Sequence, residues 1–120
     1  MLEARDVHVH YGAIHALKNV SLRVEAGSIV TLIGANGAGK STTLRALSGM
    51  RRASSGSVKF AGQELVGMAA PRIVRLGLSH CPEGRHVFPR LTVKENLELG
   101  AYIIKDKATI KSTLEQVYHL

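Results

Sequence analysis

A glycine-rich loop between an apolar run and a helical pattern restricts the fold of this chain more than any other feature. Residues 29–33 are all apolar or β-branched, which is typical of a strand covered on both faces of a parallel sheet. Gly34 ends this run, and after the loop Leu44 and Leu47 recur at helical spacing until Gly49. The pattern predicts a buried strand, a loop and a helix in direct succession.

The loop has two glycines that frame four residues ahead of Lys and Ser, which is the pattern of a nucleotide phosphate-binding loop. Glycines let the backbone turn successive N–H groups toward phosphate oxygens, and the helix N-terminus adds a partial positive charge. We expect Lys40 to contact the β- and γ-phosphates and Ser41 to hold Mg²⁺. The predicted binding residues are Gly34, Asn36, Gly37, Ala38, Gly39, Lys40, Ser41 and Thr42. The alternative is a glycine turn without a ligand.

Alternating apolar residues predict further strands on both sides of this motif. The first two segments are expected to be antiparallel, a third follows a Ser/Gly turn at residues 54–57, and a fourth covers residues 78–81. The residues that carry the first three patterns are Val7 and Val9, then Val20, Leu22 and Val24, then Val58 and Phe60.

Three further segments have helical patterns. Pro71 can open a short helix through Leu76. Thr92 and Glu95 have the spacing of a capping box and predict a helix that begins after Thr92. The apolar residues on one face of that helix are Val93, Leu97, Ala101 and Ile104, and those of a last helix are Ile110, Leu114, Val117 and Tyr118.

Composition excludes several classes of protein. The chain is 45% apolar and 21% charged, as in folded proteins, and its apolar runs are shorter than the roughly 18 to 20 residues that span a bilayer. The first residues do not resemble a secretory signal, so a cytosolic location is expected. The single cysteine, Cys81, forms no internal disulfide and is interpreted as a small core residue.

The net charge of +7 is concentrated in the middle of the chain. Such an excess attracts nucleic acid, anionic lipid or a polyphosphate, and acidic sequence beyond residue 120 would be an equally good explanation. Nucleic-acid surfaces interleave basic and aromatic residues, whereas only Phe60 and Phe88 are available here. No nucleic-acid partner is therefore predicted.

Three blocks resemble the ATP-binding subunit of ABC transporters, and the resemblance covers essentially the whole chain. They are Tyr11-Gly12-Ala13 ahead of residues 16–22, the loop at residues 34–42, and Cys81-Pro82-Glu83-Gly84-Arg85 followed by residues 87–97. The resemblance implies ATP as the ligand. It also implies that Tyr11 stacks on adenine, although a tyrosine after a strand can serve packing alone.

The third block is similar to the family's Q-loop, where most members have a glutamine that reaches Mg²⁺ and senses the membrane subunit. This chain has Glu83 at that position. A carboxylate is also a good Mg²⁺ ligand, so Ser41 and Glu83 are the metal ligands that the resemblance implies. A solvated loop glutamate is the alternative.

The sequence Pro-Glu-Gly-Arg followed by Phe-Pro is similar to that of the ATP-binding subunits of branched-chain amino acid importers. Importers of urea or short amides are the alternative. The resemblance implies integral membrane permease subunits, a second ATP-binding subunit and, indirectly, a substrate-binding protein, at the inner face of the plasma membrane. Phe88, beside Arg85 and Arg90, is either a docking residue for the permease or part of the core.

The family's Leu-Ser-Gly-Gly-Gln signature, second acidic strand and switch histidine are not found in this sequence. The six histidines present are interpreted as surface or loop residues.

The predicted fold class is α/β, a P-loop NTPase core with an antiparallel β-subdomain at the N-terminus, truncated before the remaining parallel strands. Residues 1–82 form the nucleotide-binding core, and residues 83–120 the Q-loop-like segment with the start of a helical subdomain. From these residues alone we expect ATP binding without hydrolysis, and poor stability. The alternative function is a non-catalytic nucleotide-binding fragment or interaction module without a transport role.

Overall fold

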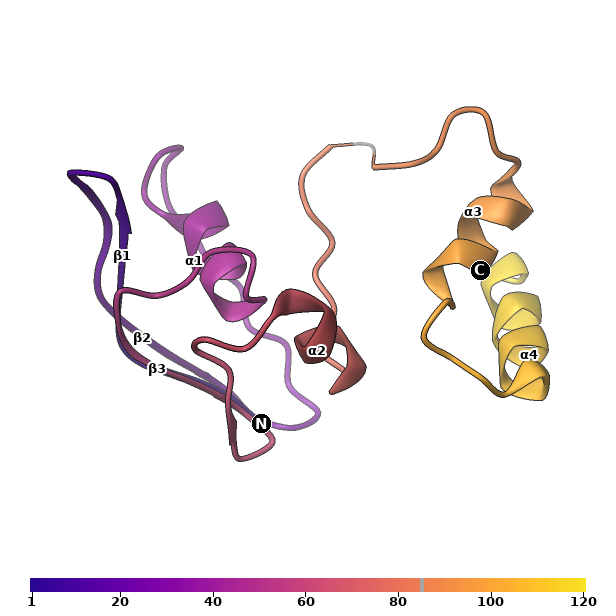
Figure 1. The fold of residues 1–120 in the computed structure, drawn as a ribbon, viewed down its shortest axis with the longest axis horizontal. Coiled ribbons are helices and arrows are strands. Elements are labelled where there is room, and N and C mark those ends of the chain that lie inside the picture. Colours follow the sequence, from indigo (N-terminus) through magenta and orange to yellow (C-terminus); the bar gives the residue numbers. More distant parts are fainter. Residues whose placement is uncertain (85) are drawn as a thin grey trace. The chain divides into compact units, whose positions relative to one another are not determined.

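The computed structural model describes residues 1–84 and 86–120, which form two compact units, Met1–His80 and Cys81–Leu120 (Figure 1). Arg85, which the sequence placed in the third block, lies outside the described residues. The elements along the chain are β1 (Leu2–Tyr11), β2 (Ile14–Val24), α1 (Lys40–Leu47), β3 (Ser55–Phe60), β4 (Gln63–Glu64), α2 (Ala70–Arg75), α3 (Val93–Gly100) and α4 (Lys107–Tyr118). The functional division at residue 82 stays a prediction.

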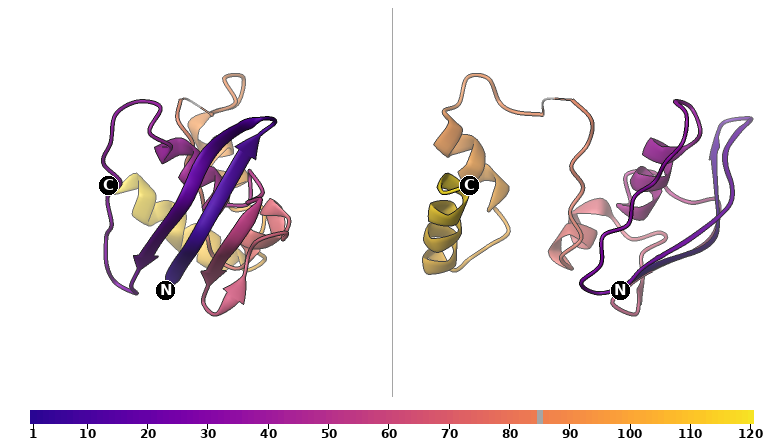
Figure 2. Two further views of the ribbon diagram at one scale, coloured as in Figure 1. Left: turned by 90° about the vertical axis from the view of Figure 1, so that its left-hand side faces the viewer. Right: turned by 180° about the vertical axis from the view of Figure 1, so that it is seen from behind.

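An antiparallel sheet in the order β2-β1-β3-β4 is the framework of the first unit, and Figure 2 shows β2, β1 and β3 side by side. The predicted alternation is confirmed, because Val7 and Val9 are 2% and 0% exposed, whereas His8 between them is half-buried and His10 after them is exposed. Ala4 is also buried, although it is an odd number of residues from Val7. The register shifts between them at Asp6, whose φ is 48°, so a bulge turns both side chains to one face.

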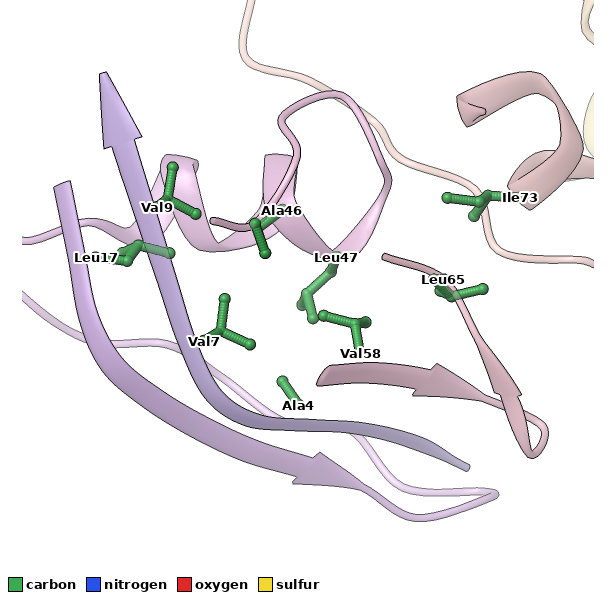
Figure 3. Packing of buried hydrophobic residues seen from close by; sticks show 10 residues of the cluster. Ala4, Val7, Val9, Leu17, Ala46, Leu47, Val58, Leu65 and Ile73 are labelled. Carbon is green, nitrogen blue, oxygen red and sulfur yellow. The ribbon is translucent and has the colours of Figure 1, made fainter. Parts of the chain in front are cut away.

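Helix α1 packs on this face of the sheet. Ala46 and Leu47 of α1 are buried with the strand residues, and Figure 3 shows Leu47 beside Val58 of β3. Burial of a leucine or valine side chain such as Leu47 or Val58 contributes about 1.5 to 3 kcal/mol of hydrophobic free energy. The complete cluster contains Ala4, Val7, Val9, Leu17, Ala46, Leu47, Ala53, Val58, Leu65 and Ile73. This core fixes where α1 begins relative to the sheet.

Two predicted strands are wrong. Residues 29–33 form no strand, and Ile29 and Ile33 are 96% and 93% exposed. A central parallel strand needs hydrogen bonds from strands on both sides. Among the described residues, β1 pairs with β2 and β3, and β3 pairs with β4, so no strand pairs with residues 29–33. Residues 78–81 also lack strand structure. Cys81 is exposed there, so its interpretation as a core residue is wrong as well.

The predicted helices form, but the end of one helix and the start of one strand differ from the prediction. The capping box is present, because the Thr92 hydroxyl accepts from the Glu95 N–H and the Glu95 carboxylate accepts from the Thr92 N–H. That helix, α3, ends at Gly100, so Ala101 and Ile104 lie beyond it. Strand β3 begins at Ser55, so residues 55–57 of the predicted Ser/Gly turn belong to the strand. No helix in the described part of the chain has both the length and the apolar character needed to cross a membrane.

Candidate functional site

The loop ahead of α1 has the backbone that its glycines permit. Gly37 and Gly39 have φ of 85° and 102°, in the left-handed region that favours glycine, as the sequence predicted. Gly34 does not need such an angle, but a Cβ there would lie 3.2 Å from the Cβ of Ala38. The Ala38 N–H donates to the Ala35 carbonyl at 3.1 Å, which closes a tight turn. Residues 34–38 are all exposed, so the loop is open to a ligand.

The start of α1 gathers positive charge at this loop. Gly39 is the N-cap, no acidic residue lies in the first turn, and the first N–H groups of a helix have no partner within the helix. The Lys40 ammonium donates to the Gly34 carbonyl and therefore spans the loop. Ser41 follows, exposed on the first turn. An ammonium, helix N–H groups and a hydroxyl at one exposed loop form a chemically suitable site for a polyphosphate.

Tyr11, at the end of β1, lies close to this helix. Its ring is half-buried and packs against the core cluster. The nearby Thr42 side chain lowers the pKa of Tyr11, and Arg45 and Arg51 lower it further. The structure thus brings the predicted adenine-stacking residue next to Thr42 of the predicted phosphate loop.

Glu83 and Phe88 belong to the other unit, Cys81–Leu120. The Glu83 side chain is exposed, so its role beside Ser41 at a metal ion stays a prediction. Among the described residues, no group of three or more His, Cys, Asp or Glu side chains is arranged to hold a metal ion. Phe88 is 60% exposed, so the core interpretation is wrong. The Asn96 side chain accepts from the Phe88 N–H at 2.8 Å and donates to its carbonyl at 3.1 Å, which holds this loop segment.

Sequence reasoning missed a group of histidines beside Tyr11. His8 Nδ1 and His15 Nε2 are 2.9 Å apart, and the His10 and His15 rings stack with centroids 4.1 Å apart. These residues lie on β1 and β2, not in loops. The alternate spacing of His8 and His10 on β1 is visible in the sequence. Only the pairing of β1 with β2, and its register, brings His15 next to them. The hydrogen bond needs a nitrogen that donates and one that accepts, so it is lost when both rings are protonated.

We expect the stability of the first unit to fall as the pH drops below about 6.5. Partial burial lowers the pKa of His15 from 6.5, and the nearby positive charge of His10, His8 and Lys18 lowers it further. The unfolded chain therefore takes up this proton more readily, so the contribution of neutral His15 is complete above pH 6.5 and is lost as the pH falls through the folded-state pKa. Thermal melting of the wild type and His15→Gln at several pH values measures this. An identical pH dependence of both proteins would contradict it.

The comparisons with known proteins agree on one family. The sequence profile of the ABC transporter family matches residues 17–119. The high-affinity branched-chain amino acid transport ATP-binding protein BraG of Pseudomonas aeruginosa is 48% identical over the whole chain, which covers 51% of that protein. The probable branched-chain amino acid transport ATP-binding protein LivF of Archaeoglobus fulgidus is 33% identical over 96% of this chain and 48% of its own length. The chain spans about half the length of the curated relatives it matches.

Solved structures show the same fold. The ATP-binding subunit of an ABC transporter is 33% identical, with a TM-score of 0.78 over 90% of this chain and 45% of that one. An ATP-binding cassette in a dimeric post-hydrolysis state, bound to ADP and Pi, is 25% identical, with a TM-score of 0.77 over 96% of this chain and 55% of that one. The predicted α/β class with an N-terminal antiparallel β-subdomain is confirmed. Because the family profile matches residues 17–119 and a relative is 48% identical over all 120 residues of this chain, the chain belongs to the ABC transporter family of ATP-binding proteins.

Proposed function

We propose that this chain binds ATP, with the triphosphate held by the loop at residues 34–42 and the adenine stacked on Tyr11. Lys40 contacts the β- and γ-phosphates, and the N–H groups of the loop and of the first turn of α1 donate to the remaining oxygens. Asn36, Ala38 and Thr42 contribute backbone groups to the same cradle.

The observation that carries this proposal is the meeting of Tyr11 with the start of α1. The pKa of Tyr11 is lowered first by the hydroxyl of Thr42, two residues after Lys40. One end of the ligand site is thus flat and apolar, and the other is cationic with free N–H groups. A nucleoside triphosphate has the complementary halves, an aromatic base and a polyanionic tail.

The oxygen donors present also fit Mg²⁺. Magnesium in nucleotide sites takes few protein ligands and fills its remaining positions with phosphate oxygens and water. Ser41 supplies a hydroxyl on the exposed first turn of α1. The ion would neutralise part of the charge on the phosphates. We assign Ser41 as its protein ligand; the family resemblance alone implies Glu83, an exposed residue of the unit Cys81–Leu120, as a second ligand.

At the level of the whole protein, we propose that ATP binding and hydrolysis power the import of branched-chain amino acids. Two relatives with branched-chain amino acid transport in their names support this substrate class. The partners in the proposal are integral membrane permease subunits, a second ATP-binding subunit and, indirectly, a substrate-binding protein. The chain would act at the cytoplasmic face of the plasma membrane, and Phe88 and Arg90 would face the permease.

Calorimetric titration tests the binding proposal. ATP and tripolyphosphate are each added to the purified chain with and without Mg²⁺. We expect both to bind, ATP more tightly because the base adds stacking on Tyr11, and both more weakly without Mg²⁺. Tyr11→Ala should reduce ATP affinity to that of tripolyphosphate. A chain that folds but binds neither compound is inconsistent with the proposal.

A further inference from the structure

A cation lies over the ring on which the base is proposed to stack. The guanidinium carbon of Arg51 is 4.2 Å from the centroid of the Tyr11 ring, well within the distance of a cation–π contact. Arg51 follows α1 in the chain, and nothing in the sequence relates it to Tyr11. Its position over Tyr11 therefore comes from the fold.

The contact is held at both ends of Arg51. Its side chain donates through Nη2 to the carbonyl of His10, the residue before Tyr11 on β1. Its backbone N–H donates to the carbonyl of Arg45 in the last turn of α1 at 3.0 Å. A side chain fixed by a hydrogen bond and a ring contact has a defined position and is more than a mobile surface arginine.

This position coincides with the place that a base needs. The Tyr11 ring packs against the core cluster, so it has limited free surface. A guanidinium is planar, and at 4.2 Å from the ring it fills the separation at which an aromatic base would stack. Arginine and adenine therefore compete for the same surface of Tyr11.

We propose that Arg51 is a gate residue of the base subsite, which covers Tyr11 in the nucleotide-free chain and is displaced when the base stacks. This inference rests on the proposed function, because it presumes that Tyr11 receives the base. The displacement costs the cation–π contact and the hydrogen bond to His10. Arg51 therefore lowers the affinity for ATP while leaving the phosphate loop itself unobstructed.

The test is calorimetric titration of ATP and tripolyphosphate against Arg51→Ala and a matched control, Arg52→Ala. Arg52 carries the same charge but lies beside Gly67 instead of over an aromatic ring. We expect Arg51→Ala to bind ATP about fivefold more tightly than the wild type, the effect of removing one surface cation–π contact. Tripolyphosphate has no base and should not bind more tightly. Arg52→Ala should bind ATP no more tightly than the wild type.

A double-mutant cycle separates gating from a general structural effect. When Tyr11 is also replaced by alanine, Arg51→Ala should no longer tighten ATP binding, because no ring remains to be uncovered. Tightening that persists in the Tyr11→Ala background would overturn the gate. Circular dichroism spectra that overlay the wild type show that each variant is folded.

Other results also decide against the gate. Weaker ATP binding by Arg51→Ala, to the same extent as by Arg52→Ala, means that Arg51 only attracts phosphate. A loss of ATP affinity without a change for tripolyphosphate means that Arg51 stacks on the base.

Lys40→Ala distinguishes a failure of the proposed ATP site from a failure of the gate. ATP binding that is as tight in Lys40→Ala as in the wild type overturns the proposed function and the gate together, whereas Lys40-dependent binding without tightening by Arg51→Ala overturns the gate alone.

Discussion

Replacing Lys40 by alanine is expected to weaken ATP binding by about a hundredfold, or roughly 3 kcal/mol. The ammonium is expected to make charge-assisted hydrogen bonds to two phosphate groups, and each such bond contributes about 1.5 to 3 kcal/mol. Among the described residues of the free protein, Lys40 donates to the Gly34 carbonyl of its own exposed loop alone, so the substitution removes little that stabilises the fold. Calorimetric titration measures the affinity, and thermal melting should show nearly unchanged stability.

The matched control is Lys59→Ala. Lys59 is an exposed lysine of β3 in the same unit, so its removal changes the net charge equally without touching the loop. We expect at most a severalfold change in ATP affinity, from the general field of the protein. Equal losses for the two variants would mean that ATP is attracted by overall charge and not held by the loop.

Gly56→Ala is expected to destabilise the first unit by roughly 3 kcal/mol or more. Gly56 lies in β3 opposite the bulge of β1, and its φ is 91°, in the left-handed region. A Cβ at this position would lie 2.3 Å from the carbonyl oxygen of Asp6 and 2.7 Å from that of Arg5. Both atoms belong to the backbone of a paired strand, so relief of the clash requires the strands to separate. Urea denaturation followed by circular dichroism measures the free energy of unfolding.

Gly62→Ala provides the comparison for this prediction. Gly62 has a φ of 80°, but a Cβ there would have no neighbour within 4 Å. Only the backbone strain remains, which costs about 1 to 2 kcal/mol. The difference between the two variants therefore isolates the collision with β1. Similar destabilisation of both proteins would show that β1 and β3 adjust without cost.

Local patterns predicted the elements whose stabilising interactions are local or follow a simple periodicity. The capping box of Thr92 and Glu95 formed because both hydrogen bonds connect residues three apart on one helix end. The alternation around Val7 and Val9 predicted a strand that buries one face, and the sheet buries these two residues. The glycines of the loop took the backbone angles that only glycine adopts readily.

Predictions failed where an element depends on partners distant in sequence. The run at residues 29–33 has the composition of a buried strand, yet a strand needs backbone partners, and none pairs with it among the described residues. The same reason applies to residues 78–81. Arg51 could not be placed over Tyr11 either, because about forty residues and two elements, β2 and α1, separate them in the chain.

The sequence by itself determined the glycine-rich loop at residues 34–42, because its backbone freedom and charge are encoded in consecutive residues and act over one turn. It also determined the two antiparallel strands and the helix starts, whose signals are equally short-range. Only the tertiary structure decided which side chains meet at Tyr11 and how the bulge of β1 matches Gly56. These contacts depend on strand register and helix packing, and a register is set by the sum of many distant interactions that no single segment contains.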